Sequence, residues 1–137
     1  MEHKEMEQGK DRHNLEKRGY IMRRLLGRGA FSRVYSVEER STGRRAACKV
    51  GENGKLFKRE EEILKRLKYP LFPEYYGSWK EDRSFFLLME EVVGESLAGL
   101  IKRGECLPVC QIAGVGMELA EGLLYLHESR PAIIFRD

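Results

Sequence analysis

The chain of 137 residues has room for one domain with a sizeable hydrophobic core. Its 42% hydrophobic and 34% charged residues are ordinary for a soluble globular protein. The formal net charge of +3 is too small to indicate nucleic acid or an anionic membrane as a partner. Three cysteines form neither an even set nor a C-x-x-C pair, so we expect a reducing, cytoplasmic location. We expect no membrane segment, because no apolar run approaches the roughly 18 residues that span a bilayer.

The first 19 residues are distinguished by their charge. They hold five acidic and five basic side chains and few large apolar ones. Such a segment has little apolar surface to bury, so we expect residues 1–19 to form a flexible, charged leader.

Strand-like segments then alternate with turn signals as far as residue 50. Residues that favour β structure predict strands at 20–26, 34–37 and 46–50, separated by turns at 27–29 and 41–43.

A helix and a hairpin follow. The spacing of apolar residues over 55–68 is typical of a helix. Residues 75–80 and 85–90 predict a hairpin whose turn is the E-D-R-S segment at 81–84.

After Gly94 the pattern becomes helical, with a short helix predicted at 96–103 and a longer one at 108–128. Five strands with one inserted helix, followed by further helices, predict an α+β fold. We expect a boundary near Gly94 within this fold, which separates a first part over 20–93 from a second part over 94–137.

The segment G-R-G-A-F-S-R-V at residues 27–34 is a candidate phosphate-binding loop. Glycines let the backbone approach phosphate oxygens closely enough for its N–H groups to donate hydrogen bonds. A dinucleotide-binding loop should open a helix, whereas residues that favour a strand follow here. The context therefore favours a flap folded over a nucleotide, and the motif alone leaves a plain hairpin turn open.

Ala47 and Lys49 are predicted to share one face of the third strand, since side chains alternate along a strand. A small residue beside a lysine leaves space for a flat ring while the ammonium reaches phosphates. The alternative is a lysine on an edge strand that points into solvent.

Glu60 is predicted to lie on the apolar face of the helix at 55–68. That face is marked by Leu56, Ile63, Leu64 and Leu67. Burial of an unpaired carboxylate costs several kcal/mol, so Glu60 requires a cation, and Lys49 is the natural candidate. The alternative is that Glu60 lies at the edge of the stripe and turns into water. Glu61 and Glu62 are instead expected to pair with basic residues on the solvent side.

These segments resemble the signature set of protein kinases: a G-x-G-x-x-G-x-V loop, the lysine of V-A-I-K, and a glutamate on the next helix. Residues 88–92 (L-M-E-E-V) resemble the family's strand-to-hinge segment, and 123–127 (L-L-Y-L-H) resemble the helix before the catalytic loop. Residues 133–137 (I-I-F-R-D) resemble the I-I-H-R-D that opens that loop. The resemblance spans 20–137 and is nearest in character to bacterial Ser/Thr kinases.

The resemblance implies a kinase N-terminal lobe, with a five-stranded antiparallel sheet and one helix, followed by the first helices of the C-terminal lobe. It implies ATP-dependent phosphoryl transfer to protein Ser/Thr, in which Lys49, paired with Glu60, holds the α- and β-phosphates. Asp137 would be the catalytic base. The ATP-binding residues implied by the resemblance are Leu26, Gly27, Arg28, Gly29, Ala30, Phe31, Ser32, Val34, Ala47, Lys49, Met89, Glu90 and Val92.

Within that set, the resemblance gives each part of the nucleotide its own contacts. Val34 and Ala47 would cover the adenine, and Met89 would be the gatekeeper. The Glu90 carbonyl and the Val92 amide would hydrogen-bond the adenine edge.

Three substitutions or spacings depart from the family pattern. Ser32 replaces the third glycine of the loop, and Phe135 replaces the histidine of H-R-D. Only ten residues separate Lys49 from Glu60, so the helix must start almost at once, which Gly51 and Gly54 would permit.

The sequence ends at Asp137, ahead of the Asn and D-F-G Asp that hold Mg²⁺ in the family. We therefore expect ATP as ligand, no metal ligand within these residues, and negligible activity for the 137-residue chain alone. An exposed face of the long helix is expected to cause self-association. Three interpretations stay open: part of a true kinase, a half-kinase that binds partners without turnover, and an unrelated nucleotide-binding α+β domain.

Overall fold

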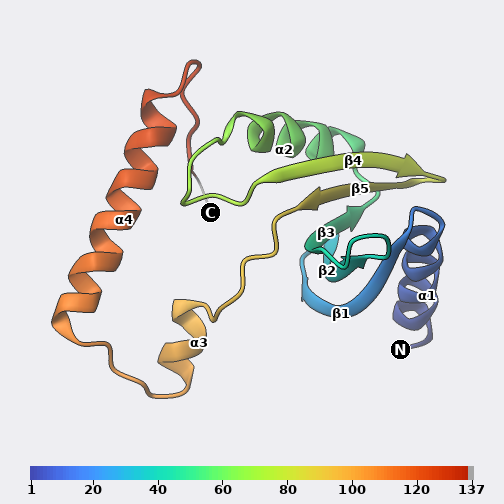
Figure 1. The fold of residues 1–137 in the computed structure, drawn as a ribbon, viewed down its shortest axis with the longest axis horizontal. Coiled ribbons are helices and arrows are strands. Elements are labelled where there is room, and N and C mark those ends of the chain that lie inside the picture. Colours follow the sequence, from blue (N-terminus) through green and yellow to red (C-terminus); the bar gives the residue numbers. More distant parts are fainter. Residues whose placement is uncertain (136–137) are drawn as a thin grey trace. The chain divides into compact units, whose positions relative to one another are not determined.

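The computed structural model describes residues 1–135 and divides the chain into two compact units (Figure 1). The first unit contains Met1–Lys68 and Pro73–Val92. The second contains Tyr69–Phe72 and the chain from Val93 onward.

The first unit is built on a five-stranded sheet. Its strands are β1 (Tyr20–Arg28), β2 (Ser32–Glu39), β3 (Arg45–Gly51), β4 (Tyr75–Glu81) and β5 (Ser84–Met89). They lie in the order β1-β2-β3-β5-β4, and every neighbouring pair is antiparallel. The predicted five-stranded antiparallel sheet and the α+β fold are therefore confirmed.

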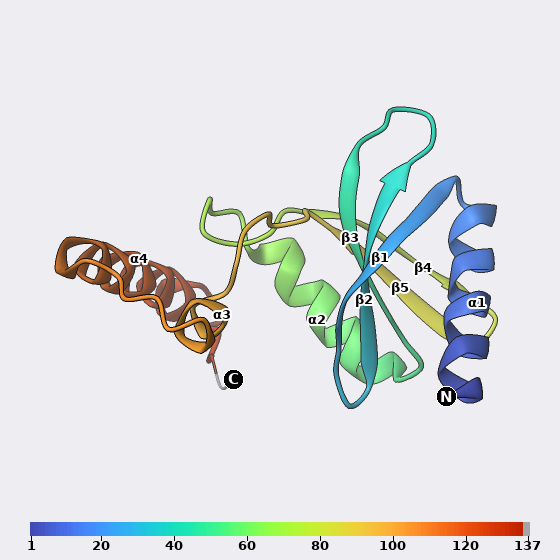
Figure 2. The ribbon, with the colours of Figure 1, turned by 90° about the horizontal axis from the view of Figure 1, so that it is seen from below.

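Helix α1 (Glu2–Lys17) replaces the predicted flexible leader, which is a correction to the sequence analysis. It lies beside the sheet (Figure 2) and buries Asp11, Asn14 and Leu15. Leu15 joins the apolar core on this side of the sheet, which includes Tyr35. Apolar periodicity does not predict this helix, because polar side chains make up most of its buried face.

Helix α2 (Gly54–Arg66) packs on the sheet and begins directly after β3, as its short connection requires. The side chain of Asn53 caps it by accepting a hydrogen bond from the Leu56 amide at 3.2 Å. Phe57 and Leu64 are the buried residues of α2, whereas Leu56 is exposed. The predicted apolar face was therefore wrong at its first position, where Phe57 is buried in place of Leu56.

The second unit contains helices α3 (Leu97–Lys102) and α4 (Val109–Glu128). Tyr125 of α4 stacks on Tyr69, with ring centroids 4.9 Å apart, and also contacts Phe72. Among the described residues of α4, only Gly122 and Leu126 are buried.

Helix α4 is also long and apolar enough to cross a membrane by length and composition, with a mean hydropathy of 1.3 over 18 residues. This finding corrects the expectation that no apolar segment is long enough to span a bilayer. The core helix of a water-soluble domain meets the same criterion, so composition alone does not assign α4 to a membrane.

Candidate active site

Lys49 on β3 and Glu60 on α2 form an ion pair, with 2.8 Å between Nζ and Oε1. The predicted contact between the third strand and the helix is therefore present. Glu60 is less buried than predicted, since 40% of its side chain and 25% of that of Lys49 are exposed. An ion pair this exposed contributes at most about 1 kcal/mol to stability. Its importance is that it fixes the position of the ammonium group.

The sheet register places the predicted adenine-contacting residues beside Lys49. Val34 on β2 is the cross-strand partner of Lys49, and Ala47 is the partner of Met89 on β5. Directly opposed residues of antiparallel strands point to the same face, and Ala47 and Lys49 share a face by alternation. One face of the sheet therefore carries the apolar side chains of Val34, Ala47 and Met89 next to the Lys49 ammonium group.

The predicted glycine loop is a tight connection between β1 and β2. Gly27 pairs with Val34, and the Gly29 N–H donates to the Ser32 carbonyl at 2.8 Å. Phe31 is exposed at the loop, and Leu26 is exposed before it. The loop therefore leaves β1 and returns in β2 without opening a helix, as a flap requires.

Gly51 allows the loop to lie against the end of β3. A Cβ atom at this position would lie 2.5 Å from the Phe31 carbonyl oxygen and 2.7 Å from the Phe57 ring. Gly54 is similarly close to another ring, with 2.9 Å between an added Cβ and Phe85. Both glycines therefore leave room for close approach at the turn into α2. The sharp turn expected of them does not use a glycine-specific conformation, since neither has a positive φ.

Two adjacent glutamates of α2 turn to different strands. Glu61 accepts hydrogen bonds from the Tyr75 hydroxyl at 3.0 Å and the Ser78 hydroxyl at 2.7 Å, both on β4. It also forms the predicted pair with Lys65, at 2.9 Å, but it is more buried than Glu60. The hydrogen bonds from Lys65 and Ser78 lower the pKa of Glu61 below its ordinary value. Glu61 thus anchors α2 on the sheet.

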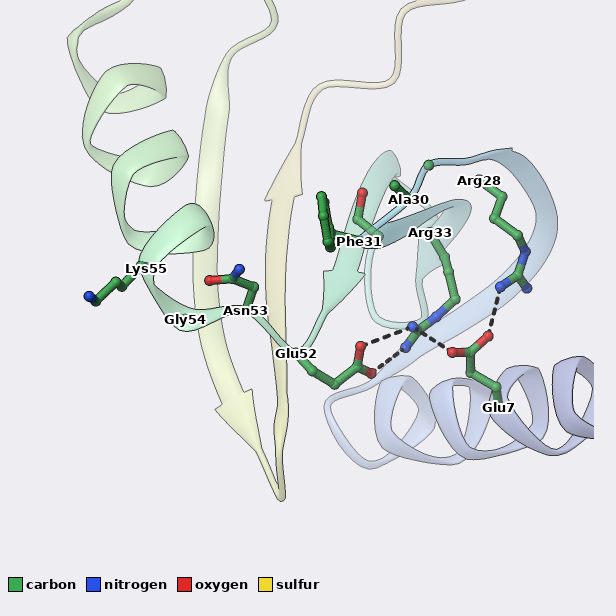
Figure 3. Close-up of a pocket in the computed structure, with 11 residues that line it drawn as sticks. Glu7, Arg28, Ala30, Phe31, Arg33, Glu52, Asn53, Gly54 and Lys55 are labelled. Atoms are coloured by element: carbon green, nitrogen blue, oxygen red, sulfur yellow. Dashed lines mark hydrogen bonds and ion pairs between the residues drawn. The ribbon is translucent and has the colours of Figure 1, made fainter.

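Sequence reasoning missed a network of charges between α1 and the glycine loop. Arg33 of β2, with 4% of its side chain exposed, binds both carboxylate oxygens of Asp11 at 2.7 and 3.0 Å. The Tyr35 hydroxyl donates to Asp11 at 2.6 Å. Figure 3 shows Arg33 lying between Glu7 of α1 and Glu52 of the turn before α2. The i,i+4 spacing of Glu7 and Asp11 was the one signal available in the sequence.

The network shifts the pKa values of Arg33 and Tyr35. Burial disfavours the charge on Arg33, but the hydrogen bonds to Asp11 and Glu52 outweigh it and raise the Arg33 pKa above its ordinary value. Burial, followed by the hydrogen bond to Asp11, raises the pKa of Tyr35 above its ordinary value. Arg33 therefore stays charged, and Tyr35 stays a hydroxyl donor.

Three of the predicted site residues, Met89, Glu90 and Val92, lie at the end of β5 or in the segment after it. The Glu90 amide donates to the Glu74 carbonyl at 2.8 Å, and Val92 is exposed. Glu91, which the sequence analysis did not single out, accepts a hydrogen bond from the Ser36 hydroxyl at 2.9 Å. Asp137, the predicted catalytic base, lies outside the described residues.

Within residues 1–135, no group of three or more His, Cys, Asp or Glu side chains is arranged to hold a metal ion. Mg²⁺ at a nucleotide site is usually held by one or two carboxylates together with the phosphates, so the Mg²⁺ that the resemblance implies stays a prediction.

A family model described as "Protein kinase domain" matches residues 20–137. The meiosis-specific serine/threonine-protein kinase mek1 of Schizosaccharomyces pombe is 31% identical over 123 residues, which cover 85% of this chain and 27% of that protein. The serine/threonine-protein kinase TIO of Arabidopsis thaliana is 34% identical over 125 residues, which cover 86% of this chain and 9% of that protein. The chain thus spans a third or less of these relatives.

A crystal structure of Rad53 1-466 in complex with AMP-PNP has the same fold, with a TM-score of 0.71 and 23% identity. The likeness covers 82% of this chain and 31% of that one. The two relatives above are eukaryotic, so the bacterial character expected from the sequence gains no support from them and stays a prediction. The sheet, the order of motifs and the family model agree, and the chain belongs to the protein kinase domain family.

Proposed function

We propose that this chain carries the ATP-binding part of a protein serine/threonine kinase. The observation that carries the proposal is the Lys49–Glu60 ion pair on the sheet face next to the glycine loop. The family match and the kinase relatives support it. AMP-PNP, an analogue of ATP, is the ligand of the Rad53 structure that shares the fold.

In this proposal different groups of the chain bind the phosphates and the adenine of ATP. Glu60 holds the Lys49 ammonium toward the α- and β-phosphates, and the backbone N–H groups of residues 30–32 approach the phosphate oxygens. The apolar residues Val34 and Ala47 cover the adenine, whose edge meets the backbone after β5.

The chemical step would fall to Asp137, which would accept the proton of the substrate hydroxyl. Positioning and metal charge supply most of the rate of phosphoryl transfer, and residues 1–135 contain no cluster of three or more side chains that could hold a metal ion. We therefore propose that residues 1–137 on their own bind ATP without measurable turnover, in a cytoplasmic protein.

The exposed apolar residues of α4 favour a second proposal, association with another protein surface. They include Val109, Ile112, Met117, Leu119, Leu123 and Leu124. Burial of such a face is favourable in proportion to its area, so the 137-residue chain is expected to self-associate in sedimentation velocity experiments. A monomer at all concentrations tested would reject this second proposal.

The first proposal is tested by titrating the chain with a fluorescent ATP analogue. Loss of one charge-assisted hydrogen bond is worth about 1.5–3 kcal/mol, so Lys49→Met should weaken binding by about tenfold or more. Lys65→Met is the matched control, because Lys65 is also paired with a glutamate of α2 but faces β4. Equal affinity in Lys49→Met and the wild type would reject the assignment of this site.

A further inference from the structure

Two arginines lie opposite each other at the base of the glycine loop. Arg28 ends β1, and its cross-strand partner is Arg33 of β2. Like charges directly opposed in an antiparallel pair repel each other, and here both belong to the residues that flank the loop at 29–32. A carboxylate that contacts both arginines is therefore expected to stabilise the end of this hairpin.

Helix α1 supplies that charge through Glu7 (Figure 3). One carboxylate oxygen of Glu7 lies 2.7 Å from Arg28 Nη1, and the other lies 2.9 Å from Arg33 Nη1. Each arm of the hairpin is thus bound by one oxygen of a single carboxylate. Glu7 precedes the residues matched by the kinase family model, which begin at Tyr20.

The same network reaches α2. Arg33 binds Glu52 at 3.0 Å, and Glu52 directly precedes Asn53, the residue that caps α2. These residues, with the loop, line an open cleft of about 750 Å³. A continuous set of contacts therefore joins α1, the glycine loop and the start of the helix that carries Glu60.

We infer that Glu7 is a positioning residue for the glycine loop, and that α1 thereby sets the affinity of the nucleotide site. The inference rests on the proposed function, since it assigns a role in binding the same nucleotide. Arg33 also binds Asp11 and Glu52, but Glu7 contacts both Arg28 and Arg33 and so links the two ends of the loop before a ligand arrives. A loop that is already ordered loses less conformational freedom on binding.

The test compares Glu7→Gln with the wild-type 137-residue chain in two measurements. Titration with a fluorescent ATP analogue should show affinity about three- to tenfold weaker in the variant. Amide hydrogen exchange without nucleotide should be faster in the peptide that covers 27–34. Glu81→Gln is the matched control, because Glu81 pairs with Lys17 of α1, at 3.4 Å and away from the loop. It should change neither measurement.

A double variant separates positioning from a general structural effect. If Glu7 acts by relieving repulsion between the arginines, Arg28→Gln should restore slow loop exchange to the Glu7→Gln chain. Failure of this rescue would overturn the inference. Glu7→Asp keeps the charge with a shorter reach and should give intermediate loop exchange. If Glu7→Gln does not fold, Glu7→Asp is measured in its place. Loop exchange in Glu7→Asp as slow as in the wild type would then count against the inference.

The outcomes distinguish this inference from the proposed function. Wild-type affinity and loop exchange in Glu7→Gln, together with ATP binding by the wild type, would overturn the inference alone. Tighter binding in Glu7→Gln would also overturn it, because a released Arg28 would then be contacting phosphate itself. Faster loop exchange in a chain whose wild type binds no nucleotide would support the positioning of the loop and reject the proposed function.

Discussion

Replacement of Asp11 by alanine tests whether α1 is an integral part of the first unit. Asp11 is 1% exposed, and its partners Arg33 and Tyr35 are also buried. Removal of one member of a buried ion pair costs about 3–5 kcal/mol, because the other charge stays buried. Arg33 keeps Glu7 and Glu52, which favours the lower end, but the Tyr35 hydroxyl loses its acceptor, which adds about 1 kcal/mol or more. We expect the free energy of unfolding to fall by about 4 kcal/mol.

The assay is urea denaturation followed by tryptophan fluorescence. Trp79 is the chain's single tryptophan and lies in β4, where it stacks on Tyr20 and Phe86 with centroids 5.8 and 5.1 Å away. Its signal therefore reports on the first unit. Glu16→Ala is the control on the same helix, since Glu16 is exposed and its replacement should change stability by less than about 0.5 kcal/mol. A loss below about 1 kcal/mol in Asp11→Ala would refute the docking of α1 and restore the flexible leader.

Three further predictions concern single residues. Gly51→Ala should destabilise the chain by about 1–3 kcal/mol in the same urea assay, because its methyl group would overlap the loop carbonyl and a ring. Gly77→Ala, where nothing lies within 4 Å of an added Cβ, should cost less, and equal losses would contradict the close approach. Cys48 is fully buried, and burial raises the pKa of its thiol, so a thiol reagent should label only the other two cysteines of the native chain. Rapid native labelling of Cys48 would contradict its burial. Burial alone would raise the pKa of Glu7, but its arginine partners lower the pKa below the ordinary value of 4.5. Because the folded-state pKa is the lower one, the stability advantage of the wild type over Glu7→Gln should be full above pH 4.5 and shrink as the pH falls below it. A stability advantage of the wild type that grows as the pH falls below 4.5 would contradict this prediction.

Much of the first unit could be predicted because its signals are local. Alternation and turn residues located the strands, and the spacing from Lys49 to Glu60 required a helix that starts directly after β3. The contact between these two side chains followed from the charge of Glu60 and its position on the helix. The exposure of Glu60 was misjudged because the apolar stripe was aligned on Leu56, whereas Phe57 is the buried residue.

The role of α1 could not be predicted from apolar periodicity. Its buried face consists largely of polar side chains, and burial of Asp11 is favourable only because Arg33 and Tyr35 lie 22 and 24 residues further along the chain. A pattern that depends on a partner so distant in sequence carries no local signal. The dual role of Glu7 likewise depends on the register that places Arg28 opposite Arg33.

The proposed function places Lys49 at the phosphates of bound ATP. An ATP acyl phosphate tests it directly, because a lysine amine close to the phosphates attacks the acyl carbonyl, forms an amide and releases ATP. Peptide mass spectrometry should find Lys49 acylated in the wild-type chain, and excess ATP should suppress this modification. Lysines such as Lys65 should show no such protection. Absence of modification at Lys49, or modification that ATP does not reduce, would contradict the placement of Lys49 at the phosphates.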